Sequence, residues 1–294
     1  MKAFTKRFFT APKDSFFLFG PRGTGKTTWL QKTYPDAYLV DLLDDKIFRN
    51  HVAYPELIRE IVKANPQTNR YVIDEIQKVP AMLDSIHGLI EDYKTHQFIL
   101  TGSSARKLRR GGVNLLAGRA LLTHFHPFMA AELGNDFSLE GSLLNGLIPL
   151  IISANAPDKA LDAYIALYMK EEVKEEGLVR NIGAFARFLE VMSFSHGSIV
   201  NISNIARECQ VSRKIVENYL SIIEDLLLGY KLPVFTRRAK RAMTIQPKFY
   251  IFDTGVYHHL RPKGPLDSPD EIGGMALEGL VFQHLKAWCD LSDG

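Results

Sequence analysis

The stretch Gly20–Thr27, GPRGTGKT, decides the fold of this chain. The apolar run 15–19 precedes it, and residues 28–32 continue it with a helical pattern. The form G-x-x-x-x-G-K-[ST] between a strand and a helix is typical of a phosphate-binding loop. Glycines let backbone N–H groups turn toward an anion, and the helix that begins near Lys26 directs its positive end to the same point. The sequence therefore predicts an anion site at this turn.

The residue types of the loop indicate ATP with Mg²⁺ as the ligand. Lys26 is placed to reach the β and γ phosphates, and Thr27 can hold Mg²⁺ through its hydroxyl. The alternative is a chance glycine-rich turn, which the preceding strand and the following helix disfavour. The residues expected to bind the nucleotide are Gly20, Pro21, Arg22, Gly23, Thr24, Gly25, Lys26, Thr27 and Thr28.

A second apolar run, residues 70–75, ends in two acids, Asp74 and Glu75. Beside a phosphate-binding loop, such a strand supplies the other half of an ATPase site. We expect Asp74 to bind Mg²⁺ and Glu75 to orient and deprotonate the attacking water. The alternative is a strand that simply ends in two solvated acids.

Two further segments carry candidate catalytic groups. The strand 97–104 ends in hydroxyls, so Ser103 or Thr101 is expected to contact the γ phosphate, although Thr-Gly-Ser is also ordinary turn chemistry. Arg119, directly before the strand 120–125, is the candidate for stabilising charge in the transition state. A solvated basic loop is the alternative for the other cations of this stretch, which are Arg106, Lys107, Arg109 and Arg110.

Composition limits the class of protein. With 294 residues, two or more domains are expected, and the net charge of +3 is too small to indicate a partner. The two cysteines, Cys209 and Cys289, have no metal-ligand spacing and are expected to be free thiols. There is no apolar leader and no run of about 18 apolar residues, so we expect a cytoplasmic protein without a membrane segment.

The second half has a different pattern. An apolar connector is expected at 141–149, and helices at 160–176 and 185–193. A short helix, a turn and a longer helix over 201–228 have the spacing of a helix-turn-helix, and the runs 230–235 and 248–252 read as two strands. Together these elements predict a winged helix.

The stretch 230–263 is basic and predicts contact with double-stranded DNA. The alternatives are a lid on the ATPase core, or a protein-docking domain with a solvated basic hairpin. Asp253 is the one acid of the stretch, and its bases are Lys231, Arg237, Arg238, Lys240, Arg241, Lys248, Arg261 and Lys263.

Four runs in order, GPRGTGKTTWL, YVIDEIQKVP, LTGSSARKL and LLAGRALLTHFHPFMAAEL, resemble the predicted AAA+ superfamily ATPases of prokaryotes. The runs NISNIARECQVSRKIVENYLSIIEDL and KFYIFDTGVY are similar to the same family. The resemblance implies an AAA+-type core with strand order 5-1-4-3-2, and it supports the roles given to Lys26, Thr27, Asp74 and Glu75. AAA+ proteins often form rings, so it also makes a homo-oligomer an expectation. Whether Arg119 acts in its own subunit or on a neighbour stays open.

The run 276–285 resembles the opening helix of the restriction-endonuclease-like domain that such proteins usually carry. The downstream Asp and the acid-x-Lys strand of that fold do not follow before Gly294, so Glu278 lacks partners and we predict no nuclease activity. We expect a truncated chain or a shortened gene, with an exposed apolar face on the last helix.

The sequence thus predicts an α/β P-loop NTPase core of AAA+ type followed by a mainly helical winged-helix domain. The expected domains are 1–138, 139–262 and, as the start of a nuclease-like domain, 263–294. The predicted function is Mg²⁺-dependent ATP hydrolysis coupled to movement of the winged helix. The alternative is a nucleotide-gated DNA-binding or protein-interaction switch with little turnover.

Overall fold

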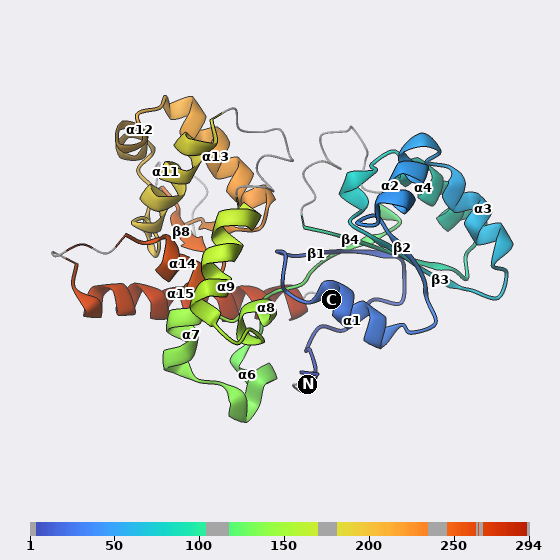
Figure 1. Ribbon diagram of the computed structural model, residues 1–294, viewed down its shortest axis with the longest axis horizontal. Helices are drawn as coiled ribbons and strands as arrows, with labels where there is room; N and C mark the ends of the chain where they lie inside the picture. The colour runs from blue at the N-terminus through green and yellow to red at the C-terminus, as the bar shows by residue number, and fades with distance from the viewer. Residues whose placement is uncertain are drawn as a thin grey trace. The chain divides into compact units, whose positions relative to one another are not determined.

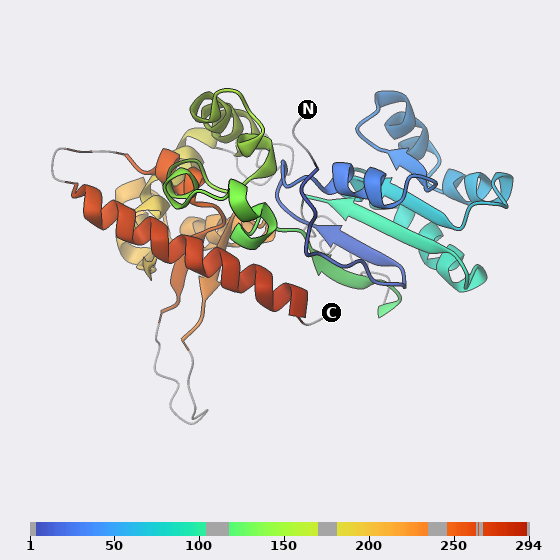
Figure 2. The same ribbon diagram turned by 90° about the horizontal axis from the view of Figure 1, so that it is seen from below.

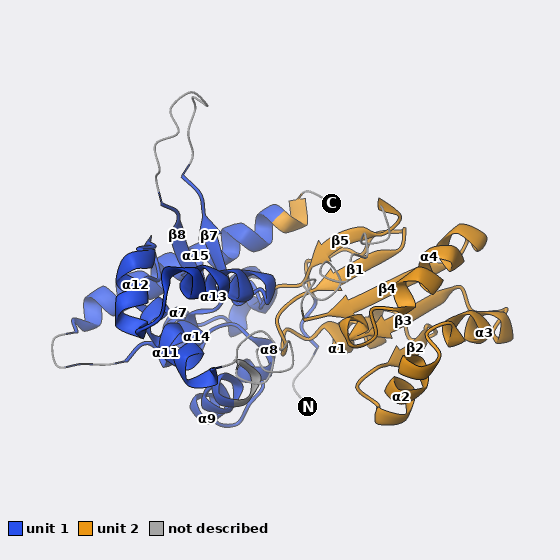
Figure 3. Cartoon of the chain, turned by 90° about the horizontal axis from the view of Figure 1, so that it is seen from above, with its two compact units in different colours: residues 1–6, 127–289 blue, residues 7–126, 290–294 orange. Residues whose placement is uncertain are grey.

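The structure is a computed structural model that describes residues 4–103, 118–169, 181–234, 246–262, 264 and 267–292. The chain divides into two compact units, which we describe separately (Figure 3). The sheet unit comprises residues 7–126 and 290–294, and the helical unit comprises residues 1–6 and 127–289.

The sheet unit is built on five parallel strands in the order β2-β3-β4-β1-β5 (Figure 1). Read from the other edge, this is the order 5-1-4-3-2, so the predicted fold class is confirmed. The strands are β1 (Phe16–Phe19), β2 (Tyr38–Asp41), β3 (Arg70–Asp74), β4 (Gln97–Gly102) and β5 (Leu121–His124). Every residue of β1 and β4 is buried, as expected for central strands covered on both faces.

Helices cover both faces of this sheet. In Figure 1, α1 lies on one face, and α3 and α4 lie on the other. Their bounds are α1 (Lys26–Thr33), α2 (Asp45–Ala53), α3 (Leu57–Ala64), the 3₁₀ turn η1 (Ile76–Lys78) and α4 (Met82–Asp92). The sequence did not predict α2, because His51 is its one buried residue and the helix therefore lacks an apolar stripe. Its N-terminus is fixed instead by the side chain of Asp44, which accepts from the N–H groups of Lys46 and Ile47.

The helical unit corrects two expectations. The connector predicted at 141–149 contains most of α7 and the first residue of α8. The helix predicted from Ala160 begins three residues earlier, as α9, and turns into a π-helix at Tyr164. Residues 170–176 lie outside the described residues. The elements up to this point are α6 (Ala130–Leu133), η3 (Gly134–Asp136), α7 (Leu139–Asn145), α8 (Pro149–Ile152), α9 (Pro157–Ala163) and the π-helix η4 (Tyr164–Met169).

The rest of the helical unit contains the predicted helices and strands in the expected order, together with strand β6 and helix α14, which the sequence did not predict. The helix α12, a turn at Gln210 with φ 54° and the helix α13 form a helix-turn-helix, and the side chain of Ser212 caps α13. A three-stranded antiparallel sheet in the order β6-β8-β7 adjoins it. These elements are α11 (Ile182–Ser193), β6 (Ser198–Ile199), α12 (Ile202–Cys209), α13 (Arg213–Asp225), β7 (Gly229–Leu232), β8 (Lys248–Ile251), α14 (Thr254–Leu260) and α15 (Pro269–Ser292).

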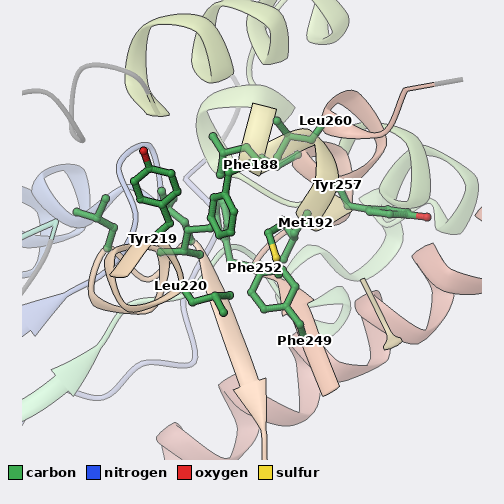
Figure 4. Close-up of a cluster of buried hydrophobic side chains, with 14 of the residues drawn as sticks. Phe188, Met192, Tyr219, Leu220, Phe249, Phe252, Tyr257 and Leu260 are labelled. Atoms are coloured by element: carbon green, nitrogen blue, oxygen red, sulfur yellow. The ribbon is translucent and has the colours of Figure 1, made fainter. Parts of the chain in front are cut away.

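One apolar core holds these elements together. Phe188 of α11, Tyr219 of α13 and Phe249 of β8 are buried in the same cluster (Figure 4). The helices and the small sheet therefore fold as one body rather than as separate hairpins.

The last helix, α15, crosses the three-stranded sheet (Figure 2). The ring of Phe282 stacks on that of Tyr250 with a centroid distance of 4.1 Å. The opposite stripe of the helix, Leu277, Val281, Leu285 and Trp288, is exposed, as expected. Within the described residues, no helix is both long and apolar enough to cross a membrane.

Candidate nucleotide site

The glycine-rich loop takes the conformation that its sequence requires. Gly23 and Gly25 have φ values of 79° and 89°, a region that favours glycine, and α1 begins at Lys26. Gly20 lies against the backbone carbonyl of Phe125, where a Cβ would collide. The loop thus lies between the end of β1 and the start of α1, as predicted for a phosphate-binding turn.

Two side chains of the loop fold back on its own carbonyl groups. Lys26 Nζ donates to the carbonyl oxygens of Gly20 and Pro21, at 2.6 and 3.2 Å. The hydroxyl of Thr24 is buried and donates to Pro21 as well, at 2.8 Å. Arg22 and Thr28, in contrast, are exposed. Phosphate oxygens are charged and accept stronger hydrogen bonds from an ammonium group than neutral carbonyls do, so this lysine can turn from the loop carbonyls to a phosphate.

The loop and the acidic strand meet at one edge of the sheet. Thr27 Oγ1 donates to Asp74 Oδ2 at 2.7 Å across 47 residues of sequence. The hydroxyl of Thr101 donates to the other oxygen of Asp74 and accepts from the N–H of Glu75 at 3.2 Å. Asp74 is thereby held from α1 and from β4, and both of its partners are hydroxyls.

Glu75 leaves the end of β3 in a left-handed conformation, with φ 59°. The 3₁₀ turn η1 follows, and it brings the amide of Gln77 against the carboxylate of Glu75. The same amide nitrogen donates to Ser103 Oγ at 3.2 Å. The structure therefore brings Glu75 and Ser103 together through a third residue, which the sequence did not predict as part of the site.

Arg119 lies at the amino ends of the parallel strands, whereas the loop lies at their carboxyl ends. Strand β5 pairs in parallel with β1 so that Leu121 lies opposite Phe16, and Arg119 therefore precedes the strand at its amino end. Its Nη2 pairs with Glu91 Oε1 of α4 at 2.5 Å. This ion pair lowers the pKa of Glu91. Arg119 is thus separated from the loop of its own chain by the length of β1.

Arg7 is a further residue of the site that the sequence did not reveal. Its guanidinium donates to the carbonyl oxygen of Thr24 at 3.0 Å and to that of His126 at 2.6 Å, and it lies 4.2 Å from the ring centroid of Phe125. It thereby ties the loop to the chain that leaves β5. The two carbonyl groups lie 17 and 119 residues away and belong to the backbone, so no side-chain pattern in the sequence marks these contacts.

The described part of the basic stretch 230–263 is ion-paired. Lys231 pairs with Glu224, Lys248 with Glu278, and Arg261 with Asp267, at 2.8, 2.8 and 2.9 Å. Arg237, Arg238, Lys240, Arg241 and Lys263 lie outside the described residues.

Glu278, considered above as a metal ligand, is engaged by the small sheet. Tyr250 donates to its Oε1 at 2.6 Å and Lys248 donates to the same oxygen. The bond from Lys248, followed by that from Tyr250, lowers the pKa of Glu278, and burial raises the pKa of Tyr250. Among the described residues, no three His, Cys, Asp or Glu side chains are grouped to hold a metal ion. Glu278 thus fastens α15 to the sheet.

Comparisons with known proteins support the AAA+-type fold of the part of the chain that contains the five-stranded sheet. Residues 13–134 match the family model described as an AAA domain, and residues 136–267 match one described as a domain of unknown function. An uncharacterized protein of Mycobacterium tuberculosis is 25% identical over 280 residues, 92% of this chain and 62% of that protein. One of Haemophilus influenzae is 22% identical over 250 residues, 79% of this chain and 61% of that protein. The chain thus spans about three fifths of the length of these curated relatives.

Two solved structures are similar at low scores. DnaA from Aquifex aeolicus bound to AMPPCP has 15% identity and a TM-score of 0.31, over 72% of this chain and 82% of that chain. The replication initiator DnaA bound to AMPPCP and single-stranded DNA has 12% identity and the same TM-score and coverage. The loop motif, the strand order and the matched AAA domain together assign the N-terminal part of the chain to the P-loop NTPase fold of the AAA+ type.

Proposed function

We propose that this chain binds Mg²⁺-ATP at residues 20–28 and hydrolyses it. The observation that carries the proposal is the contact between Thr27 and Asp74, which joins the phosphate-binding loop to the acidic strand. A hydroxyl and a carboxylate are the hard oxygens that Mg²⁺ uses at phosphate sites, together with water and the phosphates themselves. The pair therefore fits the metal, and bound Mg²⁺ would neutralise charge on the β and γ phosphates.

The other residues take their roles from this arrangement. The N–H groups of the loop and Lys26 bind the phosphates, and Ser103 contacts the γ phosphate. Glu75 accepts a proton from water as the water oxygen bonds to the γ phosphorus. The bond from that phosphorus to the bridging oxygen breaks, and ADP and phosphate are released.

Steady-state ATP hydrolysis with Mg²⁺ tests this function. We expect turnover in the wild type and a loss of about 100-fold or more in Glu75→Gln, because a positioned general base contributes about 10²–10⁴-fold. The amide has nearly the same shape as the carboxylate, so the affinity for ATP serves as the control for binding. Turnover that is equal in both proteins would contradict the proposal.

Arg119 is proposed to act on the nucleotide of a second copy, because it lies at the sheet edge opposite the loop of its own chain. Mixing Arg119→Ala with Lys26→Ala tests this role. The first variant supplies an intact loop and the second an intact arginine, so a mixed homo-oligomer should recover turnover that neither variant has alone. No recovery from a mixture shown to exchange subunits would exclude action in trans.

We propose further that the segment 201–252 forms the predicted winged helix and that its position depends on the nucleotide. The helix-turn-helix of α12 and α13, together with the antiparallel strands β6, β7 and β8, supports this proposal. Duplex DNA is its proposed ligand. With Lys231, Lys248 and Arg261 ion-paired, the proposal assigns the phosphate contacts to the cations of 235–245.

The alternative function is a nucleotide-gated DNA-binding or protein-interaction switch with little turnover. Hydrolysis that depends on Glu75 and rises with duplex DNA would favour the coupled ATPase. Binding to DNA without turnover would favour the switch, and its affinity should then fall with salt at a slope of about −0.9 per phosphate contacted. Turnover that does not change when DNA is added would favour a helical unit that binds a protein partner or acts as a lid on the ATPase core.

A further inference from the structure

The amide of Gln77 lies between two residues that have roles in the proposed function. Its side chain is buried, with 6% of its surface exposed. Nε2 donates to Glu75 Oε2 and, at 3.2 Å, to Ser103 Oγ. One side chain thus contacts the expected general base and the residue expected at the γ phosphate.

The backbone is bent to bring Gln77 into this position. Glu75 adopts the left-handed region, which costs a residue other than glycine about 1–2 kcal/mol. That conformation turns the chain away from β3 and starts η1, so that residue 77 faces residue 75. Strain of this kind persists where the surroundings hold it, and such positions cluster at functional sites.

The amide is oriented for donation. An ionised carboxylate only accepts hydrogen bonds, so the nitrogen of Gln77, and not its oxygen, must face Glu75. The oxygen then points at Gly102, where a Cβ would collide with it, and it has no hydrogen-bond partner within the described residues. A buried acceptor without a partner is unfavourable by about 1–3 kcal/mol, so stability alone does not explain this arrangement.

We infer that Gln77 is a positioning residue that sets the direction of the Glu75 carboxylate relative to Ser103. A hydrogen bond to one carboxylate oxygen fixes the rotation of the group and thereby the direction of the other oxygen toward water. Because Ser103 accepts from the same amide, the group expected at the γ phosphate and the base are held in one frame. This inference rests on the proposed ATP hydrolysis.

The test replaces Gln77 by methionine, which has a similar length and no N–H groups. We expect kcat to fall by about 10- to 100-fold, the effect of misplacing a catalytic group by about 1 Å, while the affinity for ATP changes less than about twofold. Gln97→Met is the matched control. Gln97 is also buried on β4, and its amide donates to the carbonyls of Pro12 and Asp14 at 2.9 and 3.1 Å, at the amino end of the strand. Its loss should lower Tm without lowering kcat.

The background of Glu75→Gln separates positioning from a general structural role. If Gln77 acts through Glu75, Gln77→Met has no further effect on the residual single-turnover rate of Glu75→Gln. An undiminished effect in that background would overturn the inference, as would wild-type kcat in Gln77→Met. Should Gln77→Met fail to fold, Gly102→Ala displaces the same amide with a single methyl group and should give the same loss of kcat.

The outcomes of the two proposals are distinct. Wild-type turnover in Glu75→Gln contradicts ATP hydrolysis by this base, and the inference falls with it. Turnover lost in Glu75→Gln and retained in Gln77→Met leaves the proposed function intact and overturns the inference alone.

Discussion

The carboxyl edge of the five-stranded sheet and the core of the helical unit both bury polar side chains, but they satisfy them differently. At the sheet edge, Asp74 accepts from two hydroxyls and Lys26 donates to loop carbonyls. In the helical unit, Asp253 accepts from three backbone N–H groups, of Leu147, Gly255 and Val256. Under the proposed function, hydroxyls and a lysine can change partners when phosphate and Mg²⁺ bind, whereas backbone N–H groups fixed by the fold cannot. The first set is suited to a ligand and the second to holding the fold.

Lys26→Ala tests this difference most directly. Turnover should fall by about 10²–10³-fold, since one donor to the transferring phosphate is removed. Stability without nucleotide should change little, because the lost hydrogen bonds are offset by the removal of a buried charge. ATP hydrolysis and thermal unfolding measure the two effects. A large fall in Tm would mean that Lys26 is also needed to hold the fold.

The buried groups of the helical unit predict a pH dependence with two opposed parts. Burial raises the pKa of Asp253 to about 6, so the folded state binds this proton more tightly and stability is lost as the pH rises from about 4 to 6. Burial lowers the pKa of His196 to about 4, and its Nδ1 accepts from the N–H of Ile251. The unfolded chain binds that proton more tightly, so stability is lost as the pH falls from about 6.5 to 4.

Asp253→Asn removes the contribution of Asp253 to the pH dependence of stability and leaves that of His196. As the pH rises from 4 to 6.5, the wild type loses the stability that comes from protonated Asp253 and the variant does not. The free energy of unfolding of the variant should therefore rise by about 3 kcal/mol relative to that of the wild type over this range. Urea unfolding followed by the fluorescence of Trp288 in a Trp29→Phe background reports on the helical unit, since Trp29 belongs to the sheet unit. His196→Gln should show the opposite trend. A difference from wild type that does not vary with pH would contradict both assignments.

A smaller effect is expected where α15 is fastened to the small sheet. Glu278→Gln weakens the contacts with Lys248 and Tyr250, and it should cost the helical unit about 1 kcal/mol, because the side chains of the ion pair are 43–44% exposed and screened by water. The same unfolding experiment at low and high salt measures it. If the cost is independent of salt, the bond from Tyr250 and not the ion pair is responsible.

The sequence predicted the sheet because its signals are local. The loop motif identifies β1 and α1, and the rule that parallel strands carry their ligands at the carboxyl edge places Asp74 and Ser103 beside them. These local signals do not determine the order of the strands in the sheet. The strand order was predicted from the resemblance to the AAA+ ATPases.

What the sequence missed depends on backbone partners far along the chain or on a local turn that no motif marks. Arg7 has backbone carbonyls as partners, and Gln77 reaches Glu75 only because of the left-handed turn at that residue. A glutamine shortly after a strand matches no catalytic or binding motif, so the sequence does not identify Gln77 as a residue of the site. The π-helix from Tyr164 and the short helices α7 and α8 were missed for a related reason, since packing decides such short segments more than periodicity does.

The smallest effect on stability is expected at the edge opposite the loop, where Arg119 and Glu91 form an exposed ion pair. Glu91→Gln and Arg119→Ala break this pair from either side, and each should change the free energy of unfolding of the sheet unit by less than about 1 kcal/mol. Their effects on turnover should differ. Glu91→Gln keeps the guanidinium and should hydrolyse ATP like the wild type, whereas Arg119→Ala should not, if Arg119 serves a second copy. Equal turnover in the two variants would mean that Arg119 forms only a surface ion pair with Glu91 and has no role at the nucleotide of a second copy. The proposed site would then consist of residues from the loop end of the sheet of one chain.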